Sequence, residues 1–229
     1  MWTDAALDNV TWAALTGPLA HFAEVKGRAA RCDPDVCPFT GLADPADPAA
    51  WRDLAELVGP GTDLFVAGTR VVPPPGWDRV GGLSGLQMVD AGVTGDDDPE
   101  AVVLGAADLP DILDLVERTQ PGPFRKRTVE MGTYLGIRRS GRLIAMAGER
   151  LRVPGWTEVS AVCTDHDHRG QGLAARLVRA VVAGIEARGE RPFLHVLTDN
   201  TGAIRLYARL GFAVRTPVTF GVYRERRGA

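Results

Sequence analysis

Apolar and polar residues alternate regularly over the second half of the chain. Leu173, Leu177 and Val181 recur at four-residue intervals, as on the buried face of a helix. The same period predicts helices over residues 107–120, 173–188 and 201–210. Short apolar runs between turn-forming residues predict strands over residues 101–104, 133–139, 142–152, 157–164, 192–198, 212–215 and 219–226. Strands and helices mix without strict alternation, which favours an α+β fold, a mixed sheet with helices packed on it.

The first half shows fewer regular patterns. Asp47, Pro48 and Gly59 predict a helix that Asp47 caps and Gly59 ends. A second helix is expected from about Pro18, because apolar residues follow helical spacing there. Strands are expected over residues 64–67 and 86–89. No pattern in this half points to a particular chemistry.

Two turn-forming segments divide the chain. Residues 95–100 read GDDDPE, are strongly acidic and form the best candidate for a linker. The proline-rich residues 72–76 form a softer break inside the first half. We therefore predict two parts, an N-terminal α/β region of unknown role over residues 1–98 and a second domain over residues 99–229.

The composition is that of a folded protein. Of the 229 residues, 45% are hydrophobic and 24% are charged, which excludes a disordered chain. No long apolar run and no basic start followed by an apolar core occurs, so neither a membrane helix nor a signal peptide is expected. The cytoplasm is therefore the expected location. Cys32, Cys37 and Cys163 do not make a disulfide framework, and without further ligands at zinc spacing no metal site is expected.

The net charge of −3 hides a division by sign along the chain. Residues 1–120 contain 7 basic and 20 acidic residues, a net charge of −13. Residues 121–229 contain 19 basic and 9 acidic residues, a net charge of +10. A GC-rich genome would explain the preference for arginine over lysine, but not this segregation. The basic half therefore suggests an anionic partner.

One loop between a predicted strand and a predicted helix has the composition of an anion cradle. Gly170 and Gly172 allow a tight turn and a close approach of the backbone to a ligand. The backbone N–H groups at the start of the following helix would favour a phosphate or pyrophosphate. The spacing fits neither a P-loop nor a dinucleotide fingerprint. A glycine-rich connection without a ligand explains these residues equally well.

The run VSAVCTDHDHRGQGLA over residues 159–174 resembles the acyl-CoA signature of the GNAT superfamily of N-acetyltransferases. The matching residues of that signature are Arg169, Gly172 and Ala174. Residues 200–212 resemble the family's second stretch, Asn-x-x-Ala-x-x-Leu-Tyr-x-x-x-Gly-Phe. The resemblance covers about residues 101–226 and implies a twisted mixed sheet flanked by helices. Residues 1–95 match no motif, although a degenerate copy of the same fold is one option.

The resemblance implies acetyl-CoA as co-substrate and a set of residues that bind it. The family's fourth and fifth strands splay apart, and the pantetheine arm pairs with the exposed backbone of the fourth. The amides around the loop bind the pyrophosphate, and an asparagine after the fifth strand binds the arm. The residues expected to contact acetyl-CoA are Val162, Cys163, Thr164, Arg169, Gly170, Gln171, Gly172, Leu173, Ala174, Asn200 and Tyr207.

Two catalytic tasks remain in the implied reaction, removal of a proton from the amine and protonation of the leaving thiolate. Tyr207 matches the family tyrosine that reaches the CoA sulfur and is expected to be the acid, with core packing as the alternative. Glu158 occupies the place of the glutamate base, with a solvated carboxylate or a base reached through water as the alternatives. Weaker candidates are His166, His168 and His195, the Cys163 thiol as a nucleophile, and Tyr134 and Trp156 as acceptor contacts.

The leading hypothesis is an N-acetyltransferase that transfers the acetyl group of acetyl-CoA to a primary amine by direct attack in a ternary complex. The acceptor would be a small molecule or a peptide. The alternative is a CoA-binding regulatory module without catalysis. Nucleic-acid binding by the arginines of residues 125–152 is not favoured, because few aromatic residues accompany them. No nucleic acid or membrane partner is expected, and a homodimer stays open.

Overall fold

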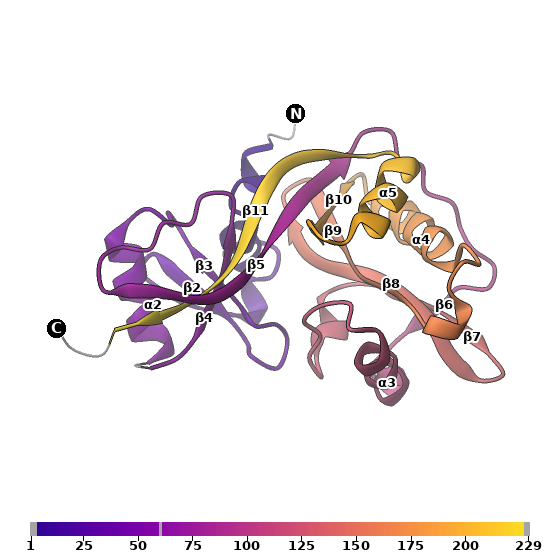
Figure 1. Ribbon diagram of the computed structural model, residues 1–229, viewed down its shortest axis with the longest axis horizontal. Coiled ribbons are helices and arrows are strands. Elements are labelled where there is room, and N and C mark those ends of the chain that lie inside the picture. Colours follow the sequence, from indigo (N-terminus) through magenta and orange to yellow (C-terminus); the bar gives the residue numbers. More distant parts are fainter. Residues whose placement is uncertain (1–3, 60, 227–229) are drawn as a thin grey trace.

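A computed structural model describes residues 4–59 and 61–226, which form a mixed sheet with helices on both faces (Figure 1). The described strands follow the order β1-β2-β3-β4-β11-β5-β10-β9-β8-β7-β6. Neighbours are antiparallel except in the pairs β3–β4 and β9–β10. The strands are β1 (Ala23–Lys26), β2 (Ala29–Cys32), β3 (Phe39–Leu42), β4 (Leu64–Gly68), β5 (Trp77–Asp90), β6 (Val102–Leu104), β7 (Tyr134–Arg139), β8 (Arg142–Val153), β9 (Trp156–Thr164), β10 (Arg191–Leu197) and β11 (Phe212–Glu225).

The helices cover the two faces of the sheet. The α-helices are α1 (Val10–Leu15), α2 (Pro48–Val58), α3 (Leu109–Thr119), α4 (Leu173–Ala187) and α5 (Thr201–Leu210). The buried residues of α4, among them Leu177 and Val181, form a core cluster with Val159 of β9 and Leu194 of β10. On the opposite face, α1 packs on β3 and β8, and α3 packs on β8 and β9. The mixed sheet with flanking helices that the sequence predicted is therefore confirmed.

Two long strands join the two ends of the molecule. β5 and β11 pair as an antiparallel ribbon that runs from the region of β4 and α2 to that of β10 and α5 (Figure 1). The strand predicted over residues 86–89 is thus only the end of β5. The two strands predicted over residues 212–226 are one strand, with a register shift between Val214 and Thr216. Pairing with β5 explains why the chain stays extended through this irregularity.

The first half contains one confirmed helix and one wrong prediction. Asp47 caps α2 as expected, since its side chain accepts a hydrogen bond from the N–H of Ala49 at 2.8 Å. The helix expected from about Pro18 does not form. The chain makes only a 3₁₀ turn at Ala20–Phe22 and then enters β1. Gly27, with a φ of 53°, allows the turn by which β1 pairs with β2, so tertiary pairing overrides the local helical pattern.

Both halves of the chain contribute to one of the hydrophobic clusters. Leu7, Val10 and Leu15 pack there with Trp156 of β9 and Phe193 of β10. β5, which precedes residue 98 in the sequence, pairs with both β10 and β11. The sheet therefore continues across the predicted division at residues 98 and 99. The segment at 95–100 lies outside helices and strands and is attached to α4, as when the N–H of Asp96 donates to the carbonyl of Arg179.

Candidate functional site

The parallel strands β9 and β10 separate shortly after they meet. Among the described residues, they pair only where Trp156, Thr157 and Glu158 face Arg191, Pro192 and Phe193. Beyond Glu158 no described residue of β9 pairs with β10, and we call this unpaired stretch between the two strands the gap. Ala161 has a φ of 53°, and the register against β8 shifts at this point. The structure thus contains the splay that the resemblance implied, together with a bulge that no sequence signal revealed.

The predicted anion loop lies at the N-terminus of α4. Gly170 and Gly172 have φ values of 78° and 76°, and a Cβ atom on either would meet nothing within 4 Å. In the described part of the chain, no hydrogen bond engages the backbone N–H of Gly170, Gln171 or Gly172. The side chain of Arg169 is exposed and makes only a 3.4 Å contact with the carbonyl of Thr164. The loop therefore presents free donors and a free cation at a helix N-terminus, which suits a phosphate group.

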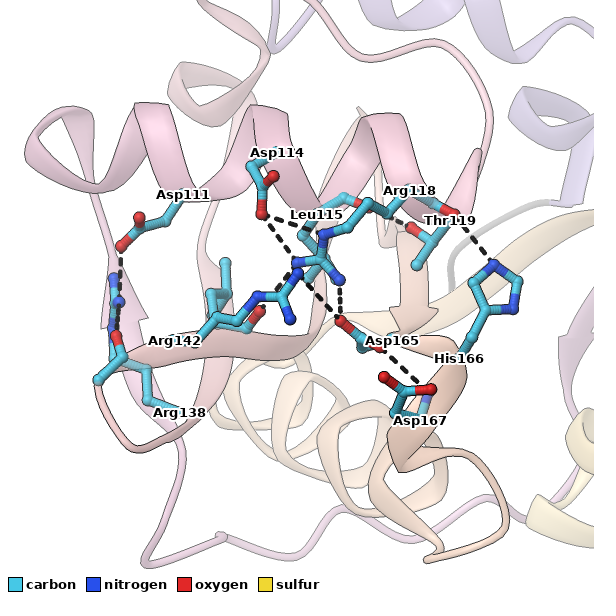
Figure 2. Close-up of polar contacts among 12 residues, drawn as sticks. Asp111, Asp114, Leu115, Arg118, Thr119, Arg138, Arg142, Asp165, His166 and Asp167 are labelled. Carbon is cyan, nitrogen blue, oxygen red and sulfur yellow. Dashed lines mark hydrogen bonds and ion pairs between the residues drawn. The ribbon is translucent and has the colours of Figure 1, made fainter.

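A buried carboxylate anchors this loop to α3. Asp165 is 4% exposed and forms an ion pair with Arg118 of α3, which also contacts the exposed Asp114 (Figure 2). Asp165 further accepts a hydrogen bond from the N–H of Asp167 at 3.1 Å. The ring of His166 contacts the carbonyl of Arg118, with Nε2 at 3.0 Å (Figure 2). The contacts of Asp165 and His166 with Arg118 thus attach the start of the anion loop to α3.

Tyr207 lies on α5, and Asn200 is the N-cap residue directly before this helix. Tyr207 is 8% exposed and packs against Phe212, and burial raises the pKa of its hydroxyl to about 12. No hydrogen bond among the described residues engages that hydroxyl. Asn200 caps α5 by accepting from the N–H of Ala203 at 3.1 Å, so its amide N–H groups are left to donate to a ligand. Both side chains are available for the expected contacts.

The residues of β9 expected to contact acetyl-CoA lie beyond its pairing with β10, and the cysteine among them is buried. Val162 packs against the α4 core, and the Thr164 hydroxyl is a buried polar atom without a hydrogen-bond partner. Cys163 faces a separate cluster that includes Tyr134, and burial raises the pKa of its thiol to about 11. A protonated, buried thiol is a poor nucleophile, so the geometry favours the packing role of Cys163.

Glu158 is buried at the last position where β9 pairs with β10. The side chain is 0% exposed, and Arg150 of β8 binds it through two hydrogen bonds of 2.9 and 2.7 Å. Nδ1 of His195 lies 2.8 Å from Oε1 of Glu158. Burial alone would raise the pKa of Glu158, but Arg150 and His195 outweigh it and hold the pKa well below its usual range. A carboxylate held this way is a weak proton acceptor, which does not fit a direct role as the base.

His195 lines a small pocket on the face of the sheet opposite α4. The pocket lies between the N-terminal segment that carries Asp8 and Thr11 and the strands that carry Gln87, His195 and Phe220. Sequence reasoning missed Gln87 and considered Arg150 only among the arginines weighed for nucleic-acid binding, because no motif accompanies either residue. Tyr134 and Trp156, weaker candidates for acceptor contacts, are 0% and 1% exposed and do not line this pocket.

The described residues contain no group of three or more side chains suited to hold a metal ion. Asp33 and Asp35, which lie near Cys32 and Cys37 in the sequence, form ion pairs with Arg127 and Lys126. Over the same part of the chain, no helix has the length and apolar character needed to cross a membrane.

Comparisons with known proteins agree with this geometry. The family described as FR47-like protein matches residues 134–220. A crystal structure from Novosphingobium aromaticivorans, described as an acetyltransferase from the GNAT family, is 40% identical with a TM-score of 0.87. That similarity covers 96% of this chain and 99% of the other. A GCN5-related N-acetyltransferase from Kribbella flavida shares the fold with a TM-score of 0.62 at 19% identity, over 96% and 97% of the two chains.

Two curated relatives match shorter segments. The N-alpha-acetyltransferase RimI of Mycobacterium tuberculosis is 39% identical over 82 residues, or 34% of this chain and 51% of the relative. The mycothiol acetyltransferase of Saccharopolyspora erythraea is 35% identical over 92 residues, or 39% of this chain and 30% of the relative. The chain thus spans about half of the first relative and less than a third of the second.

Proposed function

The chain belongs to the GNAT family of acetyltransferases, and from that premise we propose that it transfers the acetyl group of acetyl-CoA to a primary amine. The observation that carries this proposal is the gap between β9 and β10, which opens beside the free amides at the N-terminus of α4. The gap suits a thioester and its pantetheine arm, and the free amides suit a pyrophosphate.

The residues present fit acetyl-CoA along its length. The backbone edge of β9 at Val162 and Thr164 would pair with the pantetheine amides, and the orphaned Thr164 hydroxyl lies on the same strand. The Asn200 amide would donate to the same arm. The N–H groups of residues 169–174 and the Arg169 guanidinium would bind the pyrophosphate. The open space above Gly170 and Gly172 leaves room for that approach.

The reaction balances as direct transfer. An ammonium group loses one proton and its nitrogen attacks the thioester carbonyl. The nitrogen loses a second proton as the C–S bond breaks and the amide forms. The leaving thiolate takes a proton, and we assign its delivery to Tyr207. The pKa of about 12 keeps that hydroxyl protonated at neutral pH, which is the state that can donate. The buried thiol of Cys163 favours this route over an acetyl-cysteine intermediate.

The acceptor would enter from the side opposite α4 and α5. The pocket beside His195 lies on that side, and residues of the first half of the chain form one of its walls. We therefore assign the N-terminal α/β region, predicted over residues 1–98, a role in shaping the acceptor site. The one carboxylate of that wall, Asp8, is paired with Arg215 at 2.6 Å, so it does not by itself select a cationic acceptor.

Incubation with acetyl-CoA and a panel of amines tests this function. The panel would contain a short peptide with a free N-terminal alanine, spermidine and glucosamine, with free thiol measured against time and the products by mass spectrometry. We expect thiol release that depends on one class of amine, together with a product one acetyl group heavier. Binding of acetyl-CoA without thiol release from any amine would favour the alternative, a regulatory module that binds CoA.

A further inference from the structure

Arg150, Glu158 and His195 form a continuous chain of contacts from the interior to the acceptor-side pocket. Arg150 binds both carboxylate oxygens of Glu158, and the N–H of Leu151 adds a contact of 3.3 Å. The remaining contact of the carboxylate is Nδ1 of His195 at 2.8 Å. Both oxygens of Glu158 are therefore occupied, and Glu158 does not line the pocket, whereas Arg150 and the His195 ring both do.

Two neighbours determine which ring nitrogen of His195 carries the hydrogen. An ionised Glu158 only accepts hydrogen bonds, so the hydrogen lies on Nδ1. On the other side, Nε2 of Gln87 lies 3.3 Å from Nε2 of His195. The orientation of the Gln87 amide follows from its own contacts, because its Oε1 accepts from Arg215 at 3.0 Å and its Nε2 donates to the carbonyl of Leu7 at 2.9 Å. The amide therefore donates to His195, whose Nε2 holds a lone pair.

The ring is also fixed in position by its apolar neighbours. Phe193 and Phe220 meet the imidazole edge-on, each with its centroid 5.7 Å away. His195 lies on β10 two residues beyond Phe193, the last residue that pairs with β9. Its side chain is thus placed where the gap opens, on the opposite face from Leu194 and Val196, which pack on α4.

We infer that His195 accepts the proton of the amine at Nε2, and that Glu158 is a positioning residue that holds the ring through Nδ1. This inference rests on the proposed acetyl transfer. The ammonium gives one proton to Nε2, and the freed nitrogen pair attacks the thioester. The imidazolium passes that proton to water in the pocket, and the nitrogen gives its second proton to water as the C–S bond breaks. The contact with Gln87 is long for a hydrogen bond, so an incoming amine or water displaces a weak partner.

The charged groups near His195 come from several elements of the fold. Glu158 on β9 faces Nδ1 directly, the arrangement of a carboxylate behind a catalytic histidine. Arg150 on β8 lines the same pocket and is paired with Glu158 through two hydrogen bonds. Asp8 and Arg215 form a pair at the pocket and largely cancel each other. Of these groups, the Glu158 carboxylate is the one in direct contact with the ring.

The kinetic test compares His195→Gln with His21→Gln, which replaces an exposed histidine outside the pocket. The probe is the panel amine on which the wild type releases most thiol. We expect His195→Gln to lower kcat/KM about 10²–10⁴-fold and to remove the rise of kcat/KM with pH that reports the enzyme's base. Acetyl-CoA affinity, measured by calorimetry, should stay the same, and His21→Gln should match the wild type throughout.

A spectroscopic test does not depend on activity. With ¹⁵N-labelled histidine, the resonances missing from His195→Gln identify the ring, and we expect hydrogen on Nδ1 at neutral pH. Glu158→Gln would leave the buried Arg150 without its counter-charge and endanger folding, so the positioning role is tested with Glu158→Asp. This variant keeps the charge but withdraws it from Nδ1, and we expect mixed tautomers and a smaller loss of kcat than in His195→Gln.

The outcomes separate the two proposals. Hydrogen on Nε2 of His195 in the wild type would overturn the inference. So would a His195→Gln variant with the rate and pH profile of the wild type, while the proposed acetyl transfer would stand. If the wild type itself transfers no acetyl group to any amine of the panel, the proposed function and the inference fall together.

Discussion

Arg176 of α4 binds Asp98 through two hydrogen bonds, Nε to Oδ2 at 2.6 Å and Nη2 to Oδ1 at 2.7 Å. Its guanidinium also contacts Glu100 at 2.7 Å. The acidic segment at residues 95–100 is thus attached to the helix whose N-terminus forms the anion loop. Residues 95–100, whose composition predicted a linker, are thus fixed to α4 by these contacts.

Ion pairs between the two halves of the chain involve many of the residues that give the halves their opposite net charges. Basic residues after position 120 pair with acidic residues before it, as in Arg127–Asp33, Arg191–Asp90 and Arg224–Asp63. In the described residues after position 120, the basic side chains without a carboxylate within ion-pair distance are Arg125, Arg169, Arg179, Arg205 and Arg209. The division by sign therefore reflects mainly contacts inside the molecule. The case for a bound anion rests on Arg169 and the loop amides.

Removal of the Asp98 charge should destabilise the protein. Asp98 has a side chain only 5% exposed, so Asp98→Asn should lower the free energy of unfolding by about 1–2 kcal/mol, with the partly exposed Arg176 limiting the effect. Urea denaturation at neutral pH measures this change. Asp97→Asn is the control, because Asp97 is exposed, carries the same charge and forms no ion pair among the described residues. Equal stability of the two variants would contradict the prediction.

The same pair predicts a dependence on pH. Hydrogen bonds from Arg176 hold the pKa of Asp98 below its usual range. A group whose pKa is lowered by folding stabilises the folded state above its unfolded pKa, and this stabilisation is lost as the pH falls through the folded value. The unfolding free energies of the wild type and Asp98→Asn should therefore converge in acid. A difference that stays constant down to the acid transition would exclude this linkage.

Gly172 and Gly189 allow strain to be separated from ligand contact. They lie at opposite ends of α4 with φ values of 76° and 74°, and a Cβ on either meets nothing within 4 Å. Alanine at either position should cost about 1 kcal/mol of stability, because a left-handed backbone disfavours a side chain. Only Gly172→Ala should also weaken acetyl-CoA binding in calorimetry, since its methyl group enters the proposed phosphate site. Equal affinity in the two variants would refute the proposed pyrophosphate site.

The elements of the second half could be predicted because their signals are local. Ser140 and Gly141 predicted a hairpin, and both have positive φ values, 50° and 81°, as a tight hairpin turn requires. The period of α4 and the Gly211 stop of α5 were equally local. The glycine motif and the predicted helix together were sufficient to locate the anion loop in the sequence, because the glycines determine the backbone conformation of the loop itself.

Other features depend on partners distant in the sequence. β5 extends to residue 77 only because β11 pairs with it along its length. The environment of Glu158 depends on Arg150 from another strand, across a register shift that no pattern of residues indicates. The motif could therefore suggest Glu158 as a base, whereas its burial and its occupied oxygens required the fold. The contact between Gln87 and His195 also required the fold, because the two residues are 108 positions apart in the sequence.

The ion pair between Arg118 and Asp165 should affect acetyl-CoA binding indirectly. Asp165→Asn removes the charge that ties the anion loop to α3, so we expect acetyl-CoA affinity to fall about fivefold to tenfold, since a hydrogen bond of this kind contributes roughly 1 kcal/mol. Hydrogen exchange at residues 166–172 should become faster. Asp114→Asn, which removes the exposed partner of the same arginine, should change neither measurement. Loss of affinity in both variants would show that the arginine, and not the loop anchor, matters.

The hydroxyl of Tyr207 is the group that Tyr207→Phe removes while leaving the packing against Phe212 intact. If this hydroxyl protonates the leaving thiolate, kcat should fall about 10²-fold, in the range that general acid catalysis contributes. Acetyl-CoA affinity should change little, since the ring and its burial remain. Stopped-flow measurement of thiol release and calorimetry of acetyl-CoA binding distinguish the two quantities. A variant with full turnover would reduce Tyr207 to a packing residue, whereas equal losses of turnover and affinity would make it a binding residue.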